Sequence, residues 1–217
     1  HSVISLDFAI GNTPGYHSTI FPPYFVAGAL FSGFAMVLTL TIPLRRAFGL
    51  YDFITDVHLD HAGKVMLATG WLLAYGYACE IFVAFYSGDE FEISMTIDRW
   101  TGFYAPVYWA MMFCNVLVPQ LLWFRRVRRN VVVLFALSLV VNLGMWMERV
   151  LIVVSSLHRD FLPSSWGLFI PTFWDWTILL GTLCAFAWLF LVFVRVLPSI
   201  SISEMRLLVR ESAERAS

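Results

Sequence analysis

Five long apolar segments, each with very few charged residues, constrain this chain more than any other feature of its sequence. A bilayer core of about 30 Å is crossed by roughly 20 helical residues at a rise of 1.5 Å each. Each segment is long enough to do so; they cover approximately residues 21–44, 65–87, 104–124, 130–157 and 168–195. We therefore predict an all-α, polytopic transmembrane bundle with about five whole spans.

The composition supports this interpretation and excludes two other classes. Hydrophobic residues make up 59% of the chain and charged residues 13%, whereas a soluble domain is nearer half apolar and a quarter charged. A soluble enzyme and a nucleic-acid-binding protein are therefore both excluded, and the lipid bilayer is the first expected partner.

The two ends of the chain define smaller regions. Residues 1–10 are typical of the end of a preceding helix, closed by a cluster of helix breakers, namely Gly11, Asn12, Pro14 and Gly15. Since the first residue is His1, we expect the chain to be part of a longer polypeptide. The predicted organisation is a helix end and periplasmic loop at 1–20, a bundle at 21–197 and a cytoplasmic amphipathic tail at 198–217. Pro119 is predicted to kink the third span.

The basic residues predict the orientation, because cytoplasmic loops retain positive charge. Eleven lysines and arginines fall on one predicted side: Arg45, Arg46, Lys64, Arg125, Arg126, Arg128, Arg129, Arg195, Arg206, Arg210 and Arg215. Only Arg99 and Arg159 fall on the other side. We therefore expect loops 45–64 and 125–129 and the C-terminus to be cytoplasmic, with 88–103 outside as an acidic loop.

Ionisable side chains inside the apolar segments are the main candidates for function, because they are costly in lipid. They are Asp7, Glu80, Glu148, Arg149 and Asp175. Counting the helical rise from the helix ends places the four carboxylates in one layer near the outer side. Such a layer suits proton acceptance from a quinol or a proton relay. The alternative is structural, with Arg149 neutralising Glu148 and with Glu80 and Asp175 as further locks; for Asp7 the functional interpretation is favoured.

A second polar group is predicted at the cytoplasmic mouth of the second long apolar segment. It contains His58, Asp60, His61 and Lys64, followed inward by Tyr75 and Tyr77. His58 and His61 can share a helix face, but no third metal ligand is evident, so no metal site is predicted. These residues are interpreted as interfacial anchors and helix caps, or as an entry point for protons.

Electron-carrying cofactors are not expected in this chain alone. The three cysteines, Cys79, Cys114 and Cys184, stand singly in apolar segments, without the spacing of a haem-attachment or iron–sulfur motif. The histidines fall at or beyond the helix ends, where they cannot hold a haem between spans.

Several long motifs resemble the NrfD/polysulfide-reductase family of membrane subunits. They are HSVISLDFA at 1–9, HSTIFPPYFVAGALFSGFAM at 17–36 and NLGMWMERVLIVVSSLHRDFLPSSW at 142–166. A further motif, HLDHAGKVMLATGWLLAYGYACEIFVAFYSG at 58–88, is similar to the C-terminal half of the ActC subunits of alternative complex III. The resemblance extends over nearly the whole chain.

The resemblance implies part of a membrane subunit of a bacterial quinol:electron-acceptor oxidoreductase. Such a subunit binds quinol, here expected to be menaquinol, near the periplasmic face of the inner membrane. It passes electrons to a periplasmic iron–sulfur subunit, alongside other integral subunits and c-type cytochromes. The motif aspartate corresponds to Asp7, and the motif histidine to His1; other quinol ligands lie in N-terminal helices outside this sequence. The alternatives are a proton-coupled secondary transporter or a structural scaffold.

Overall fold

The computed structural model describes residues 1–11, 15, 20–158, 162, 164, 166–197 and 205–206 of the chain. Every regular element in these residues is a helix, and no strand occurs among them. Five helical segments are long and apolar enough to cross a membrane: Phe21–Ala47, Asp56–Tyr86, Ala105–Trp123, Val131–His158 and Phe173–Val196. The predicted all-α fold with five helices long and apolar enough to span a membrane is therefore confirmed. The predicted cytoplasmic tail lies almost wholly outside the described residues.

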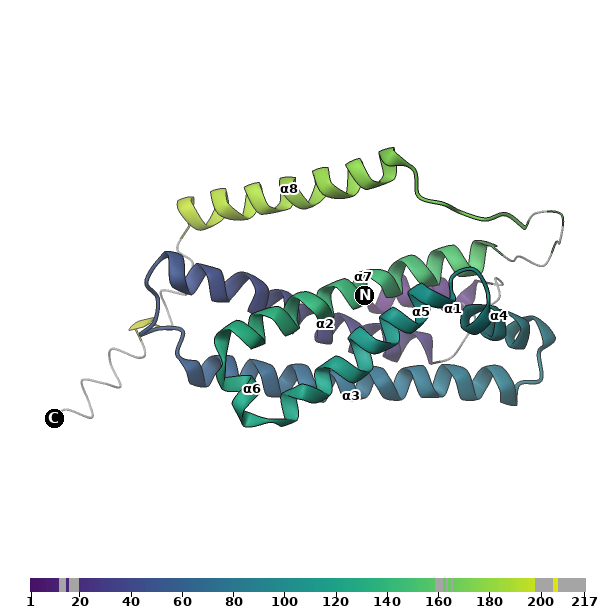
Figure 1. Cartoon of the computed structure of the whole chain (residues 1–217), viewed down its shortest axis with the longest axis horizontal. Coiled ribbons are helices and arrows are strands. Elements are labelled where there is room, and N and C mark those ends of the chain that lie inside the picture. Colours follow the sequence, from purple (N-terminus) through teal and green to yellow (C-terminus); the bar gives the residue numbers. More distant parts are fainter. Residues whose placement is uncertain are drawn as a thin grey trace. The chain divides into compact units, whose positions relative to one another are not determined.

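The chain divides into two compact units, His1–Leu168 and Phe169–Ser217. The second unit contains one helix long enough to span a membrane, α8 (Phe173–Val196). All other spanning helices belong to the first unit (Figure 1).

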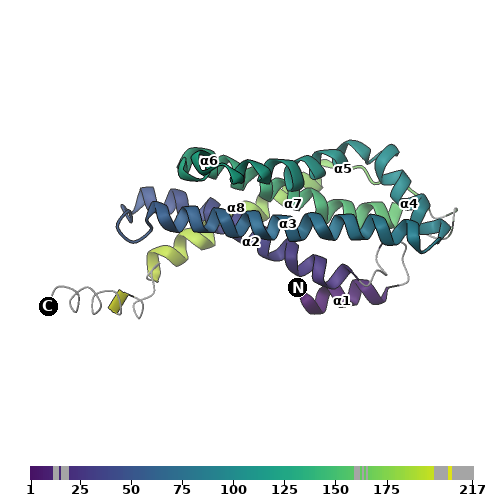
Figure 2. The same cartoon turned by 90° about the horizontal axis from the view of Figure 1, so that it is seen from below.

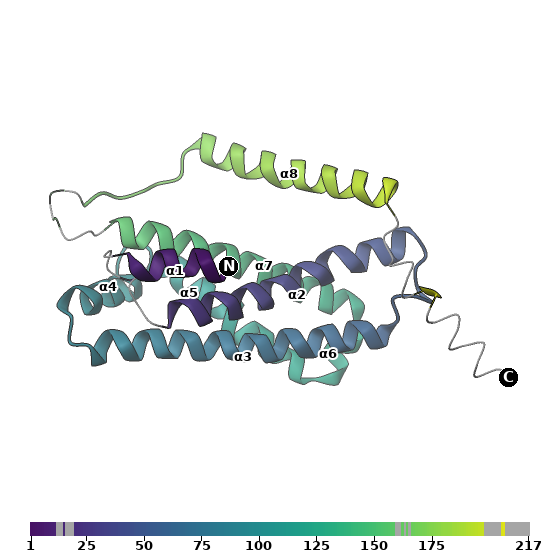
Figure 3. The ribbon, with the colours of Figure 1, turned by 180° about the vertical axis from the view of Figure 1, so that it is seen from behind.

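Three long helices form the centre of the first unit. Helix α2 (Phe21–Ala47) packs against α3 (Asp56–Tyr86) and α7 (Val131–His158). The short helix α1 (Ser2–Ile10) lies against α2 (Figure 3). The core between these helices is apolar, with the large side chains of Phe21, Phe31, Leu38, Met66, Leu73, Leu134 and Val141 fully buried.

The second span begins earlier than the sequence predicted. Its apolar part starts near residue 65, but α3 already begins at Asp56. Thr55 caps this end, because its backbone N–H donates to His58 Nδ1 over 3.2 Å and its hydroxyl lies 2.9 Å from the same atom. With 31 residues, α3 is about 46 Å long, so its ends extend beyond a hydrocarbon core of about 30 Å.

The third span is irregular, in agreement with the expected effect of Pro119. It starts as α5 (Ala105–Met112), continues as a π-helical turn, η1 (Phe113–Leu117), and ends as a 3₁₀ helix, η2 (Val118–Trp123). Proline has no N–H and crowds the carbonyl of the preceding turn, which accounts for the change before Pro119. The change reaches further than a local kink, because the α-helix already ends at Met112.

Two predicted loops contain helices. The acidic loop 88–103 contains α4 (Glu90–Thr101), which Asp89 caps by accepting a 2.9 Å hydrogen bond from Phe91 N–H. Loop 125–129 forms a single helical turn, α6 (Arg125–Arg129). Figure 2 shows α4 and α6 at opposite ends of the first unit. We call these the acidic end and the arginine-rich end.

Candidate functional site

The carboxylate of Glu148 lies at the centre of a buried polar network. Its side chain is only 1% exposed, and it lies within the membrane-spanning helix α7, nearer to the end at His158 than to the start at Val131. Tyr24 from α2 donates a hydrogen bond to Oε1, and Tyr77 from α3 donates one to Oε2 over 3.0 Å. Three helices are thus joined at one acid, whose two oxygens each accept a hydrogen bond.

The network continues from Tyr77 to the third span. Asn115 Nδ2 donates to the Tyr77 hydroxyl oxygen over 2.9 Å. Asn115 is 1% exposed and lies in the π-helical turn η1. Such turns insert one extra residue into a helix and frequently mark functional sites. Here the turn directs a polar side chain at the tyrosine that binds Glu148.

Two glycines make room for this network. A Cβ atom at Gly76 would lie 2.8 Å from the Tyr24 ring, and one at Gly144 would lie 2.6 Å from Cys114 Cβ and in contact with Asn115 Oδ1. Both distances are too short for any larger residue. The small residues therefore let Tyr24 and Asn115 approach between the helices, as is common in membrane bundles.

Arg149 lies beside Glu148 but is not its closest partner. Its Nη2 atom is 3.7 Å from Glu148 Oε1, and its guanidinium sits over the Phe25 ring, 3.8 Å from the ring centroid. The alternative of a simple ion pair is thus incomplete, because tyrosine hydroxyls bind the acid more closely. The positive charge still offsets part of the cost of burying a carboxylate.

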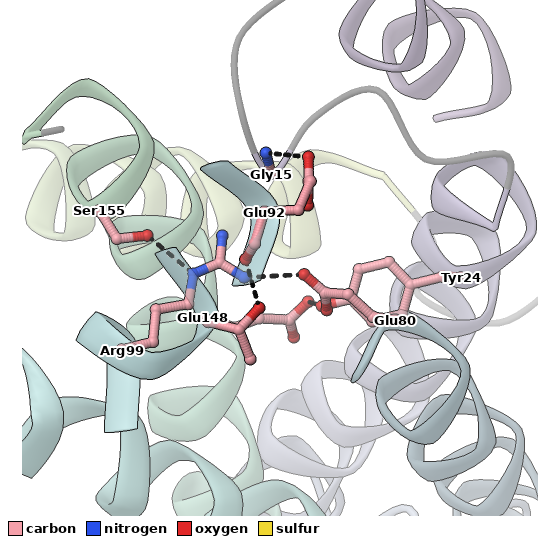
Figure 4. Close-up of polar contacts among 8 residues, drawn as sticks. Gly15, Tyr24, Glu80, Glu92, Arg99, Glu148 and Ser155 are labelled. Carbon is pink, nitrogen blue, oxygen red and sulfur yellow. Dashed lines mark hydrogen bonds and ion pairs between the residues drawn. The ribbon is translucent and has the colours of Figure 1, made fainter. Parts of the chain in front are cut away.

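A partly buried ion pair lies next to this network. Arg99 from α4 contacts Glu80 from α3, with 2.8 Å between Nη1 and Oε1, and its Nε donates to Ser155 Oγ over 3.1 Å. Figure 4 shows Arg99 between Glu80 and Ser155, with Glu148 close by. The helix α4 therefore folds back and inserts a cation that the sequence had assigned to an external loop.

A small cavity separates the two groups. It is lined by Glu148, Tyr24 and Tyr77 on one side and by Glu80 and Arg99 on the other, and its volume is about 30 Å³. One or two water molecules fit such a space, but an aromatic head group does not. Water there would connect Glu148 to Glu80.

Glu80 also faces a second cavity towards the acidic end. This cavity, of about 160 Å³, is lined by Gly15, Glu80, Ser87, Asp89 and Glu92, with Val83 and Ala84. Glu92 accepts a 2.8 Å hydrogen bond from Gly15 N–H (Figure 4). Glu80 thus stands between the buried cavity and a group of acids near the end of the bundle.

Asp7 and His1 lie apart from these cavities. Asp7 is on the exposed face of α1, whereas Phe8 on the adjacent face packs on Phe21 and Phe25, with ring centroids 6.0 and 6.1 Å apart. The ring centroids of His1 and Phe25 are 6.4 Å apart. The Arg149 guanidinium packs over the same Phe25 ring. Aromatic packing through Phe25 therefore links α1 to the network, while the Asp7 carboxylate faces outward.

The other site residues predicted near the start of α3 do not join the Glu148 network, apart from Tyr77. Tyr75 is 65% exposed and points away from the bundle, in contrast to Tyr77. Asp60 forms ion pairs with Lys64 and Arg128, at 2.6 and 2.8 Å. The His58 side chain is the partner of the cap residue Thr55 described above, while His61 lines a groove at the arginine-rich end.

Asp175 serves as a helix cap in the second unit. Its Oδ2 atom accepts hydrogen bonds from the backbone N–H and the hydroxyl of Thr172, both at 2.7 Å. This is the reciprocal arrangement of a capping box at the start of α8. Asp175 is therefore an exposed helix cap, a role that the sequence analysis did not consider for it.

Sequence reasoning missed three members of the network: Tyr24, Arg99 and Asn115. Arg99 is the one cation in the otherwise acidic segment 88–103, and Asn115 is an amide within an apolar span. Both residues could have been selected as candidates from the sequence for these reasons. Within the described part of the chain, no three His, Cys, Asp or Glu side chains form a group that could hold a metal ion.

The fold and this site define a polytopic membrane protein with an ionisable network inside its helix bundle. Residues 2–159 match the family model described as "Polysulphide reductase, NrfD". The chain therefore belongs to the NrfD family, whose members are membrane subunits of quinol-linked redox complexes. The match includes α1 with Asp7 and every residue of the network.

A second similarity is to a tyrosine permease from Enterobacter agglomerans. The two proteins are 28% identical over an alignment of 115 positions, and the match covers 47% of this chain and 27% of the permease. The chain thus covers only about a quarter of that relative.

Proposed function

We propose that this chain is part of the quinol-oxidising membrane subunit of a quinol:electron-acceptor oxidoreductase of the alternative complex III type. Quinol oxidation yields quinone, two electrons and two protons. In this proposal the electrons pass to a periplasmic iron–sulfur subunit and on to c-type cytochromes. The residues of this chain receive and conduct protons. The complex lies in a bacterial inner membrane, with the arginine-rich end and the C-terminus in the cytoplasm.

The observation that carries the proposal is the burial of Glu148 between two tyrosine hydroxyls. A carboxylate that is 1% exposed within a membrane span is costly, and packing alone would be served better by an apolar residue. Hydroxyls, a water-sized cavity and a second carboxylate adjoin it. Carboxylates, hydroxyl groups and water molecules can each accept and release protons, which is what a proton path requires.

The proposed route runs from Glu148 to the acidic end. A proton on Glu148 would pass through water in the 30 Å³ cavity to Glu80, with Arg99 holding the Glu80 carboxylate in place. From Glu80 it would enter the second cavity, where Glu92 and Asp89 lie. Each step joins groups that line the same cavity.

We place the quinol at the beginning of this route, at the exposed face of α1, which packs through Phe25 against Arg149 beside Glu148. The cavity beside Glu148 is too small for a quinol ring, whereas Asp7 is exposed on α1, which begins directly after His1. In this assignment Asp7 accepts a proton from the quinol hydroxyl, and His1 contacts the head group. The N-terminal part of the same subunit would complete the site, and menaquinol is the expected substrate.

Substitution of Asp7 tests this assignment. Asp7→Asn keeps the size of the side chain but removes the base, so quinol oxidation by the assembled complex should slow by about 10²-fold. Asp7→Glu should retain part of the activity. Asp52→Asn, in the turn at the arginine-rich end, is the matched control and should leave the rate unchanged. Parental activity in an assembled Asp7→Asn complex would make Asp7 structural and move the quinol site elsewhere.

A second candidate function is proton-coupled transport, favoured by the similarity to the tyrosine permease. Buried acids also couple protons to solutes in transporters. Uptake of labelled tyrosine into proteoliposomes, driven by a proton gradient, distinguishes the two functions. Uptake that is lost in Glu148→Gln would favour transport, and quinol oxidation without uptake would favour the redox role.

A further inference from the structure

A groove at the arginine-rich end has no part in the proposed proton route. It has a volume of about 440 Å³ and lies between the start of α3 and the turn α6. Its lining is mostly charged: Asp56, Asp60, His61, Lys64, Arg125 and Arg129, with Val57. The charges in this lining determine what the groove can bind.

The two acids of the groove are already neutralised. Asp60 is held by both Lys64 and Arg128, and Asp56 is held by Arg45 at 2.7 Å. Among the residues that the structure describes, no acidic side chain lies within 4.0 Å of Arg125 or Arg129. Two guanidinium groups and His61 are therefore left to bind an anion.

Arg128 fixes the positions of the two free arginines. Its Nη1 atom donates to the carbonyl oxygens of Leu122 and Trp123, at 2.5 and 3.0 Å, while its Nε binds Asp60. This anchors the turn α6 against α3. Arg125 and Arg129 are four residues apart, so they share one face of the turn and both line the groove, whereas Arg126 does not.

The groove lies at the level of a membrane surface. Trp123 and Phe124 directly precede α6 and are 60% and 64% exposed, as is typical of aromatic residues at the lipid–water interface. Beyond them, η2 and α3 continue into the apolar part of the bundle. A ligand in the groove would therefore have lipid chains beside it.

We propose that this groove binds the phosphate of an anionic phospholipid. Arginine pairs bind phosphate through charge-assisted hydrogen bonds, and basic pockets at membrane surfaces recognise anionic head groups. A lipid is favoured over free phosphate, because the exposed Val57, Trp123 and Phe124 provide apolar contacts for its glycerol and acyl part. This binding is independent of quinol oxidation.

Native mass spectrometry of the purified full-length protein, titrated with phosphatidylglycerol, tests the proposal. Arg125→Gln and Arg129→Gln should each weaken retention of the tightly bound lipid by about 5-fold, and the double variant by about 30-fold. Arg126→Gln removes the same charge from the same turn but not from the groove, so it should change retention by less than about 2-fold. Phosphatidylcholine should not occupy the site.

Three outcomes would overturn the proposal. One is equal loss of lipid in Arg126→Gln and in Arg125→Gln, which would indicate attraction to the whole basic surface. Another is unchanged retention in the double variant. The third is displacement of the lipid by inorganic phosphate alone, which would identify the groove as a site for free phosphate. The amount of folded protein in the membrane checks that each variant assembles.

Discussion

Asn115 donates a hydrogen bond from Nδ2 to the hydroxyl oxygen of Tyr77 over 2.9 Å, and this contact determines where the Tyr77 proton points. Because the oxygen is already accepting from Asn115, the O–H group is available to donate to Glu148 Oε2. Asn115 is therefore a positioning residue for the buried carboxylate, although it does not touch that carboxylate itself.

Replacement of Asn115 should weaken proton transfer without destroying the bundle. Asn115→Leu removes one hydrogen bond, worth about 1–1.5 kcal/mol, so we expect quinol oxidation to slow by about tenfold. Gln120→Leu is the matched control, because Gln120 lies in the same span and donates to the backbone oxygen of Val116 instead. Equal rates in the two variants would show that Asn115 has no positioning role.

Gly144 provides the space for Asn115. Gly144→Ala would place a Cβ atom 2.6 Å from Cys114 Cβ and against Asn115 Oδ1, which should cost about 1–3 kcal/mol by overpacking. The apparent Tm in detergent should fall by about 2–4 °C for each kcal/mol. Gly33→Ala has nothing within 4 Å of the added carbon and should leave the Tm unchanged or slightly higher. A Tm in Gly144→Ala equal to that of the control would contradict this packing.

Glu80 and Arg99 should behave as a coupled pair. Either Glu80→Gln or Arg99→Gln leaves one charge without its partner, and the side chains are only 27% and 12% exposed. A double-mutant cycle on thermal stability should give a coupling of about 1–2 kcal/mol. Additive single effects would mean that the pair contributes little and that α4 is held by other contacts.

The orientation of the bundle is open to a labelling experiment. We expect a membrane-impermeant thiol reagent to modify Arg126→Cys only from the cytoplasmic side, in a background without Cys79, Cys114 and Cys184. The reason is the concentration of arginines at that end. Modification from the periplasmic side alone would reverse the orientation and, with it, the direction of the proposed proton route.

From the sequence we predicted that Asp7, Glu80, Glu148 and Asp175 lie at one depth, because helical rise is constant and depth can be counted along a span. Of these four residues, Glu80 and Glu148 line one cavity. The ends of the helices were harder to predict. The apolar segment indicates only the part of α3 that lies in lipid, whereas the capping box of Thr55 and His58 starts the helix at Asp56.

The remaining members of the network depend on features that counting does not capture. Asn115 reaches Tyr77 because of a π-helical turn before Pro119, and no periodicity of the span indicates that turn. Arg99 reaches Glu80 because α4 packs back against α3, α5 and α7. Both contacts arise from tertiary packing, and neither is a property of one segment alone.

The central claim is that Glu148 carries protons released by quinol oxidation. Stopped-flow measurement of quinol oxidation and proton release by the assembled complex, with a pH-indicator dye, tests it most directly. Glu148→Gln preserves the size of the buried side chain but cannot take up a proton, so both rates should fall by about 10²-fold. Glu90→Gln, an exposed change on α4, should leave them unchanged. Parental rates in an assembled Glu148→Gln complex would contradict the proposed route.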